Sequence, residues 1–295
     1  MLPLMQRVRS GLPILADGGL GTLLFQMGLK PGECPELLNL SRPELPEQVA
    51  ALYLQAGSEI VTTNTFGGSP AKLAMYGLQD RTAEINAAGV AAVRRAVGRQ
   101  AYVAGSCGPT GRMLKPMGDL SPDEVAEGFR RQIAALHQAG IDVLFIETMI
   151  DLQEAVLAVK AAKEVAPELP VSATMTFNRT PRGFFTVMGA SVRKAAEELA
   201  AAGADLVGSN CGNGIEHMVA IAREMREATT KPLIIQSNAG LPEIRDGVAV
   251  YSETPEFMAE KARDLFEIGV AVVGGCCGTT PAHIQALRGA LPRDF

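Results

Sequence analysis

Three cysteines in this sequence of 295 residues are placed where they could hold a metal ion. Cys276 and Cys277 follow an apolar run at 270–273, and glycines on both sides let the backbone turn sharply. Cys211 closely follows a second apolar run, at 205–207. If both runs are neighbouring strands of one sheet, three thiols converge at its carboxyl edge. Three thiolates suit Zn²⁺, and catalytic zinc sites keep a fourth position for water or substrate. The sequence therefore predicts a three-thiolate zinc site.

The cysteines leave other interpretations open. Cys276 and Cys277 could form a vicinal disulfide, although five cysteines at irregular spacing indicate reduced thiols and a cytoplasmic protein. Cys107 also follows a strand-like run, so it could be a fourth thiol near the metal, a residue that contacts the ligands from behind, or a packing residue. Cys34, in a proline-flanked loop, is expected to be a surface or packing thiol.

The histidines are poor candidates for ligands or catalytic bases. His137, His217 and His283 fall inside segments that we expect to be outer helices. Without a histidine near the thiols, a Ser–His–Asp or Cys–His nucleophilic mechanism lacks its base.

Charge and composition exclude several classes of partner. The net charge is −5 and no Lys/Arg-dense face is evident, so we expect neither nucleic acid nor an anionic membrane as a partner. No apolar run reaches the roughly 20 residues that span a bilayer. The segment 1–11 lacks the apolar middle region of a signal peptide.

Strand-like and helix-like segments alternate along the chain. Short runs that are apolar on both faces, typical of a parallel sheet covered by helices, occur at 13–16, 59–63, 101–104, 142–146, 170–175, 205–207, 232–236 and 270–273. Helical segments follow them at 47–56, 81–97, 121–140, 151–165, 191–202, 214–228, 254–268 and 281–291. Eight such pairs predict an α/β fold, a single-domain (β/α)8 TIM barrel over 1–295. An open doubly wound sheet is the alternative.

In such a barrel the active site lies at the carboxyl ends of the strands. Asp17 and Glu147 stand at the ends of strongly apolar runs and would suit an ammonium group. The backbone amides of the glycine loop 17–22 could hold a carboxylate at a helix start, although the loop lacks the Gly-Lys-(Ser/Thr) of a phosphate loop. Together they predict a zwitterionic amino acid as ligand. A salt bridge to a neighbouring loop is the alternative role of Glu147.

Motifs recur in order at nearly every strand end, over roughly 12–291. They are Asp17-Gly18-Gly19-Leu20-Gly21-Thr22, Thr63-Asn64-Thr65-Phe66, Gly108-Pro109-Thr110-Gly111, Glu147-Thr148, Asn210-Cys211, Asn238-Ala239-Gly240 and Gly274-Gly275-Cys276-Cys277-Gly278-Thr279-Thr280-Pro281. This set resembles the zinc-dependent homocysteine S-methyltransferase family, and is most similar to the homocysteine-binding barrel of cobalamin-dependent methionine synthase.

The resemblance implies a role for each matching position. It implies a (β/α)8 barrel with Zn²⁺ on Cys211, Cys276 and Cys277. The amino-acid end of homocysteine would be held by Asp17, the loop glycines Gly18 and Gly19, and Glu147, with Asn64 and Asn238 lining the pocket. Independently of the resemblance, Asn210 and Cys107 are candidates for residues that contact the metal ligands without binding the metal.

The chemistry that the resemblance implies is methyl transfer to the zinc-activated thiol of homocysteine, which gives methionine. A free thiol, with a pKa of about 8.5, is mostly protonated at pH 7, and coordination to zinc deprotonates it. We expect the donor to be methylcobalamin on a separate corrinoid protein, because the sequence ends after the barrel and Asn64-Thr65-Phe66 differs from the motif of betaine- and S-methylmethionine-dependent relatives.

Alternatives to this function remain. A betaine-like or S-methylmethionine-like donor would use the same zinc-thiolate chemistry. Cys107 and the glycine-rich 210–214 depart from the family pattern, which would fit a different thiol acceptor. A barrel aldolase or phosphate-using isomerase would need a rim lysine or a phosphate loop near the last two strands. A non-catalytic zinc-binding barrel would instead close its metal site with a fourth protein ligand. No oligomeric state follows from the sequence.

Overall fold

Eight parallel strands form the centre of the structure, a computed structural model that describes residues 1–245 and 248–292. They are hydrogen-bonded in the order β1-β12-β9-β8-β5-β4-β3-β2. The two ends of this order meet, because Ala16 pairs with Ile60 and the amide of Glu59 donates to the carbonyl of Leu15 at 2.7 Å. The prediction of a TIM barrel is therefore confirmed, and the open sheet is wrong. The strands are β1 (Ile14–Leu15), β2 (Ile60–Thr62), β3 (Tyr102–Cys107), β4 (Val143–Met149), β5 (Val171–Met175), β8 (Leu206–Asn210), β9 (Leu233–Ser237) and β12 (Val270–Gly275).

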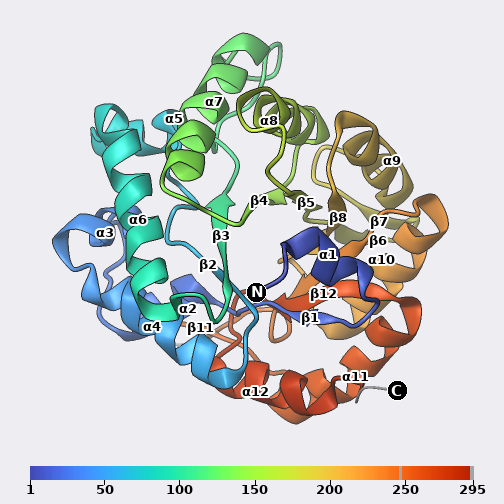
Figure 1. Cartoon of the computed structure of the whole chain (residues 1–295). Coiled ribbons are helices and arrows are strands. Elements are labelled where there is room, and N and C mark those ends of the chain that lie inside the picture. Colours follow the sequence, from blue (N-terminus) through green and yellow to red (C-terminus); the bar gives the residue numbers. More distant parts are fainter. Residues whose placement is uncertain (246–247, 293–295) are drawn as a thin grey trace.

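A ring of helices surrounds the strands (Figure 1). Its members are α4 (Glu44–Ala56), α6 (Thr82–Val97), α7 (Pro122–Gln138), α8 (Leu152–Val165), α9 (Val192–Ala202), α10 (Ile215–Ala228), α11 (Pro255–Ile268) and α12 (Pro281–Ala290). Their starts follow the expected capping chemistry: the Ser121 hydroxyl accepts from the amide of Glu124, whose carboxylate accepts from the amide of Ser121. None of the described helices is both long and apolar enough to cross a bilayer.

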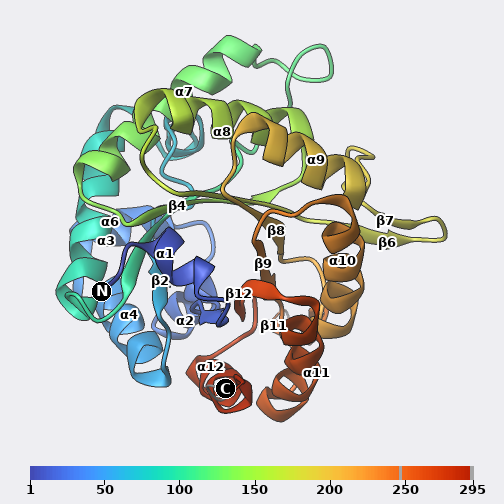
Figure 2. The same ribbon diagram turned by 45° about the vertical axis from the view of Figure 1, so that its right-hand side comes forward.

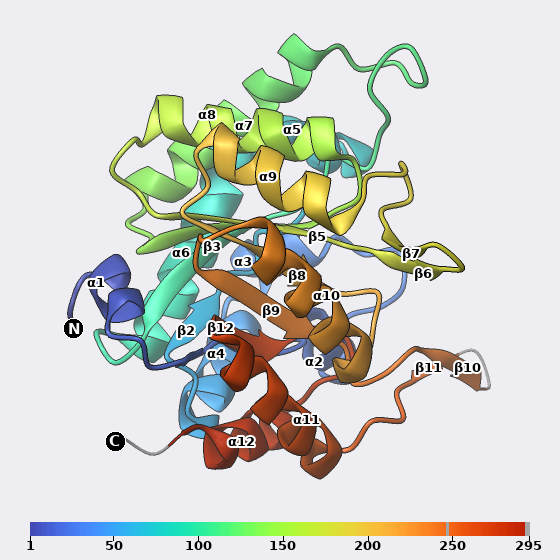
Figure 3. The same ribbon diagram turned by 90° about the vertical axis from the view of Figure 1, so that its right-hand side faces the viewer.

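Short elements that the sequence did not reveal decorate the barrel. They are the helices α1 (Leu4–Arg9), α2 (Leu20–Gln26), α3 (Leu38–Ser41) and α5 (Pro70–Leu73), the 3-10 turns η1 (Pro35–Leu37), η2 (Ala74–Tyr76) and η3 (Gln79–Arg81), and the hairpins β6 (Asn178–Thr180)–β7 (Gly183–Phe185) and β10 (Glu243–Arg245)–β11 (Val248–Val250). The β6–β7 hairpin projects well beyond the helix ring (Figure 2). Both hairpins lie at the end of the barrel opposite α1 (Figure 3).

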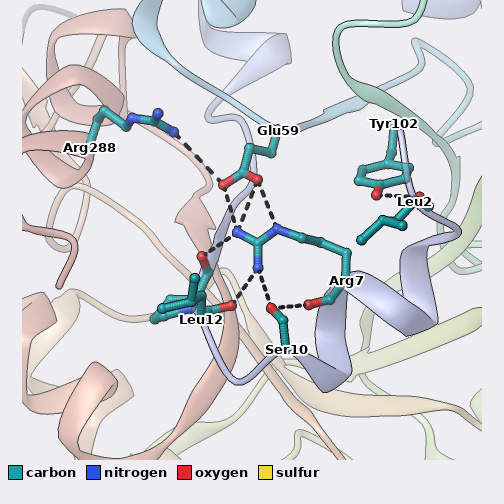
Figure 4. A network of polar contacts seen from close by, with 8 residues as sticks. Leu2, Arg7, Ser10, Leu12, Glu59, Tyr102 and Arg288 are labelled. Carbon is teal, nitrogen blue, oxygen red and sulfur yellow. Dashed lines mark hydrogen bonds and ion pairs between the residues drawn. The ribbon is translucent and has the colours of Figure 1, made fainter. Parts of the chain in front are cut away.

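Helix α1 closes the amino end of the barrel. Arg7 donates to the carboxylate of Glu59, at 3.1 Å for the shortest contact, and to the backbone carbonyl of Leu12 at 2.8 Å (Figure 4). Leu4 and Val8 of the same helix join the apolar cluster inside the barrel. This end is therefore plugged, and the opposite end is left for the site.

Alternation along each strand separates two cores. One cluster fills the barrel interior and includes Ala104, Phe145, Leu206, Ile234 and Val272. The other lies between the strands and the helix ring. Two residues further along each strand, the interior face continues into Ser106, Glu147, Gly208, Gln236 and Gly274. The same alternation that builds the core thus aims polar and small residues at the carboxyl mouth.

Substitution of Gly208, on this interior face, tests the described packing of the strands. A Cβ at Gly208 would lie 1.8 Å from the backbone oxygen of Ile234, its partner in the parallel ladder. We expect Gly208→Ala to lower the free energy of unfolding by about 3 kcal/mol, as overpacking does. Gly128, inside α7, has nothing within 4 Å of an added Cβ. Gly128→Ala should therefore raise this free energy by about 1 kcal/mol through helix propensity. Denaturant unfolding measures both, and a neutral Gly208→Ala would contradict the described register.

Candidate active site and metal centre

A pocket of about 390 Å³ opens at the carboxyl mouth of the barrel. Eight of the positions proposed from the sequence line it, and they are Asp17, Gly18, Gly19, Asn64, Glu147, Cys211, Cys276 and Cys277. Among the described residues that line it, the only charged side chains beyond these are acidic, and none is Lys, Arg or His. The pocket therefore favours a ligand with a cationic group.

The three thiols form one cluster in this pocket. The Sγ atoms of Cys211, Cys276 and Cys277 lie within 4.8 Å of one another, and those of Cys211 and Cys277 are 3.8 Å apart. All three are partly exposed, and no disulfide links them in the described structure. Three strong sulfur donors at this spacing, open to the pocket on one side, match the donor set and the accessibility of a catalytic zinc site. The residues present therefore fit Zn²⁺.

Backbone hydrogen bonds hold the two cysteine loops together. The amide of Cys276 donates to the carbonyl of Ser237 at 2.7 Å, and the amide of Ala239 donates to the carbonyl of Cys277 at 3.0 Å. The amide of Cys211 donates to the carbonyl of Gln236 at 3.2 Å, and Cys211 has a φ of 61°, in the left-handed region. Strand β9 is thus the element between the two loops that sets the spacing of the sulfurs.

Contacts within the cluster shift the pKa values of Cys276 and Cys277 in opposite directions. Hydrogen bonds from Cys211 and then Cys276 lower the pKa of Cys277 far below that of a free thiol. The same contacts, with burial, raise the pKa of Cys276 well above it. Cysteines bind metal as thiolates, so metal binding to this cluster must release protons.

The glycine loop after β1 packs directly against the cysteine loop after β12. The amide of Gly19 donates to the Thr279 hydroxyl at 3.0 Å, and that hydroxyl donates to the carbonyl of Cys276 at 2.7 Å. An added Cβ at Gly18 would lie 2.6 Å from the same hydroxyl oxygen, and one at Gly19 would lie 2.7 Å from the Cys276 carbonyl oxygen. Glycine is needed at both positions because the two loops approach so closely.

Asp17 carries an unsatisfied carboxylate oxygen. Its Oδ2 accepts from the amide and from the hydroxyl of Thr62, both at 2.7 Å. Its Oδ1 is buried and has no hydrogen-bond partner within the described chain. Burial raises the pKa of Asp17 to about 7, against the lowering effect of the Thr62 hydrogen bonds. An ammonium group at Oδ1 would satisfy this oxygen and favour the ionised form.

Glu147 presents the second carboxylate. Its Oε1 accepts from the Ser106 hydroxyl at 2.5 Å, and its Oε2 lies 3.4 Å from the side-chain nitrogen of Asn210. Burial raises its pKa to about 7, and the nearby Asp17 carboxylate adds to the rise. No Lys or Arg pairs with Glu147 among the described residues, so the salt bridge considered for it is absent. A cation bound between Asp17 and Glu147 would stabilise the ionised form of both carboxylates.

These acids predict an unusual pH dependence of stability. Because the folded pKa values exceed the ordinary values, the folded state holds protons that the unfolded state releases between about pH 4 and pH 7. The free energy of unfolding of the ligand-free protein should therefore fall as pH rises through this window. For Asp17 alone the loss is on the order of 4 kcal/mol. Unfolding of wild type and Asp17→Asn at several pH values measures it, and parallel curves for the two proteins would refute it.

The remaining predicted positions lie around the pocket or behind it. Asn64 lines the pocket, and its side-chain nitrogen donates to the carbonyl of Pro35 at 2.7 Å. Asn238 is buried, with an unpartnered Oδ1, and is not among the lining residues described. Cys107 donates to the Oε1 atom of Gln132 in α7 at 3.1 Å, in the core between strands and helices. The structure thus places Cys107 away from the three thiols.

Several residues that hold the site together were not among the positions predicted from the sequence. Thr62 and Ser106 hold the two acids, and Glu36, which lines the pocket, accepts from the amide of Gly67 at 2.7 Å. Tyr251 follows the β10–β11 hairpin, and its hydroxyl hydrogen-bonds to Cys277 and helps lower the pKa of that thiol. Alternation would have found Ser106, because it shares the interior face of its strand with Ala104. Nothing in the local sequence marks Tyr251.

Comparison with known proteins points to one family. A sequence model described as homocysteine S-methyltransferase matches residues 14–291. A methionine synthase of Mycobacterium tuberculosis is 32% identical over 305 residues, which cover 98% of this chain and 25% of that protein. A methionine synthase of Mycobacterium leprae is 30% identical over 307 residues, with the same coverage of 98% and 25%. The chain thus spans about a quarter of the length of these curated relatives.

A solved structure shares the fold over nearly the whole chain. The metallated form of the homocysteine methyltransferase MmuM from Escherichia coli has a TM-score of 0.81 at 24% identity, covering 97% of this chain and 99% of that one. Its apo form has a TM-score of 0.76 at 23% identity, covering 98% of this chain and 99% of that one.

Proposed function

The chain belongs to the homocysteine S-methyltransferase family, and from this premise we propose that it methylates the thiol of homocysteine to give methionine at the pocket described above. The observation that carries this proposal is that one pocket holds both a cluster of three thiols and a pair of carboxylates. Three thiols lie within 4.8 Å of one another, and two carboxylates of raised pKa line the same space. The first suits a sulfur-activating metal, and the second suits the ammonium group of an amino acid.

The amino-acid end of homocysteine is proposed to bind between β1 and β4. Its ammonium group takes the unpartnered Oδ1 of Asp17 and the carboxylate of Glu147. Its carboxylate is proposed to lie against the glycine loop 17–22, which lines the pocket. Asn64 closes the side of the pocket. This arrangement directs the thiol end toward the cysteines.

The thiol end is proposed to reach the cluster of Cys211, Cys276 and Cys277, which would hold Zn²⁺. When bound, zinc would lower the pKa of the substrate thiol so that its sulfur is a thiolate at neutral pH. The thiol proton passes to solvent, the sulfur lone pair forms the new S–CH₃ bond, and the bond between methyl and donor breaks with its electrons leaving on the donor. The lining residues described include no histidine, and none is required, because no protein base takes part.

The donor proposed is methylcobalamin held by a corrinoid partner. The support is the resemblance to the homocysteine-binding barrel of cobalamin-dependent methionine synthase, together with the 32% identity to a methionine synthase. S-methylmethionine-like and betaine-like donors would use the same thiol chemistry and remain alternatives.

The test measures methionine formed from homocysteine by the zinc-loaded protein, with methylcobalamin, S-methylmethionine or betaine supplied in parallel. Methionine from methylcobalamin is expected. Methionine only from one of the other two donors would overturn the proposed donor and leave the acceptor standing. No methionine from any donor, with methylation of another thiol instead, would overturn homocysteine as the acceptor.

A further inference from the structure

Asn210, at the end of β8, is a fully buried amide whose orientation is fixed. Its Oδ1 accepts from the amide of Thr148 and from the hydroxyl of Thr174, both at 2.7 Å. The backbone N–H of Thr148 can only donate, so the side-chain atom that it contacts must be the amide oxygen. The Nδ2 atom must therefore be the end that contacts Glu147 and Cys276.

The Nδ2 atom faces more acceptors than it has hydrogens. It lies 2.8 Å from the Thr148 hydroxyl oxygen, 3.4 Å from Oε2 of Glu147 and 3.8 Å from Sγ of Cys276. The short contact occupies one of its two N–H groups. The second N–H is left between a carboxylate proposed to bind the substrate ammonium and a sulfur proposed to bind the metal. One hydrogen thus has two competing acceptors.

Strained backbone holds this amide in place. Thr148 and Cys211, with φ values of 60° and 61°, are the non-glycine residues in the left-handed region within the described ranges. Thr148 is bonded to both ends of the Asn210 amide, and Cys211 follows it in sequence. Such conformations cost about 1–3 kcal/mol each and persist only where the surroundings enforce them. The packing around Asn210 therefore enforces these two conformations and fixes the position of its side chain.

We propose that Asn210 is a positioning residue that couples the amino-acid end of the pocket to the metal ligand Cys276. This inference rests on the proposed function. When the ammonium group pairs with Glu147, it neutralises that carboxylate, and the fixed N–H, which lies between the two acceptors, then interacts mainly with Cys276. A hydrogen bond to a ligand sulfur withdraws electron density from it, so the metal it holds takes up the substrate thiolate more readily. Binding of the amino-acid end of the substrate thus favours coordination of the substrate sulfur to the metal.

Coupling of this kind is reciprocal. A metal-bound Cys276 is a thiolate and competes more strongly for the shared N–H, so the hydrogen bond to Glu147 weakens. Glu147 then gains more free energy from pairing with the ammonium group. Metal and amino acid therefore each raise the affinity for the other by the same factor. Without the N–H of Asn210 this factor should return toward one.

The experiment uses Co²⁺ in place of zinc and L-2-aminobutyrate, which is homocysteine without its thiol. In the wild-type protein we expect aminobutyrate to move the thiolate-to-cobalt absorption band to shorter wavelength. We also expect it to bind roughly fivefold more tightly to the cobalt-loaded than to the metal-free protein. In Asn210→Ala the band shift and the affinity difference should both vanish. Asn210→Asp retains an oxygen for Thr148 and Thr174 but has no N–H, so it should behave likewise.

A matched control separates this role from general support of the strand. Thr176 donates to the backbone carbonyl of Asn210 at 3.0 Å and does not touch its amide. Thr176→Val should keep both the band shift and the affinity difference.

Each contrary result has a distinct meaning. If aminobutyrate binds the wild-type protein without a band shift and with equal affinities, or if Asn210→Ala retains both effects, the coupling is overturned. If both Asn210 variants lose cobalt stoichiometry, Asn210 holds the site together and the coupling is again overturned. If aminobutyrate does not bind the wild-type protein at all, the proposed function itself fails, and with it this inference.

Discussion

Replacing Cys276 with serine is expected to abolish zinc binding and to lower kcat/KM for methionine formation by roughly 1,000-fold, about 4 kcal/mol of transition-state stabilisation. Cys276 is central in the cluster, since it neighbours Cys277 in sequence and lies within 4.8 Å of Cys211 through space. Zinc deprotonates a thiol but not a serine hydroxyl, so the variant would offer only two thiolates, those of Cys211 and Cys277. Two protein ligands are fewer than the three that a catalytic zinc site uses. Metal analysis and initial rates measure the two effects.

The chain supplies its own controls for this substitution. Cys34 donates to Glu36 and Cys107 donates to Gln132, and neither belongs to the cluster. A serine at either position can make the same hydrogen bond, so Cys34→Ser and Cys107→Ser should each retain one zinc per chain. Full zinc content in Cys276→Ser, or loss of zinc in both controls, would contradict the assignment of ligands.

The second large effect is expected at Asp17. Asp17→Asn should raise the KM for homocysteine by roughly 100-fold, because a charge-assisted hydrogen bond worth up to about 3 kcal/mol is lost. The new side chain can still accept from Thr62 through its oxygen, but it presents an NH₂ group where Asp17 has its unpartnered Oδ1. The ligand-free protein should at the same time become more stable above pH 7, because a buried charge has been removed.

Asp142→Asn provides the opposite signature. Its carboxylate accepts from the amide of Val103 at 2.7 Å and from Arg94 at 2.8 Å, at the start of β4 and away from the pocket. We expect this variant to lose stability and to leave the KM for homocysteine unchanged. Steady-state kinetics and denaturant unfolding of the two variants decide the matter, and an unchanged KM in Asp17→Asn would remove Asp17 from the ammonium site.

The barrel could be predicted from the sequence because its signal is local. Each strand is a short apolar run with a capped helix after it, and eight repeats of this unit leave few alternatives. Strand ends were predicted too short at β3, β4, β8 and β12, where the run gives way to glycine or polar residues. Parallel ladders are made by backbone groups, so they continue through such residues regardless of side-chain polarity.

The alternation of side chains along a strand is enough to predict that Cys107 lies outside the pocket. Successive side chains of a strand face opposite sides, so Ser106 and Cys107 cannot both face the pocket. The structure gives the pocket to Ser106 and the helix layer to Cys107. The contacts of Asn210 could not be predicted in this way. Those of its side-chain nitrogen with Glu147 and Cys276 join strand ends more than 60 residues apart in sequence, and they depend on the register of β4 against β5 and β8.

The measurement that tests the central claim most directly is X-ray absorption at the zinc edge of the purified protein, with and without homocysteine. The account predicts three sulfur neighbours at about 2.3 Å in the protein alone and four when homocysteine is bound. An unchanged sulfur count on addition of homocysteine, or a site already closed by a fourth protein ligand that homocysteine does not displace, would contradict activation of the substrate thiol at these three cysteines.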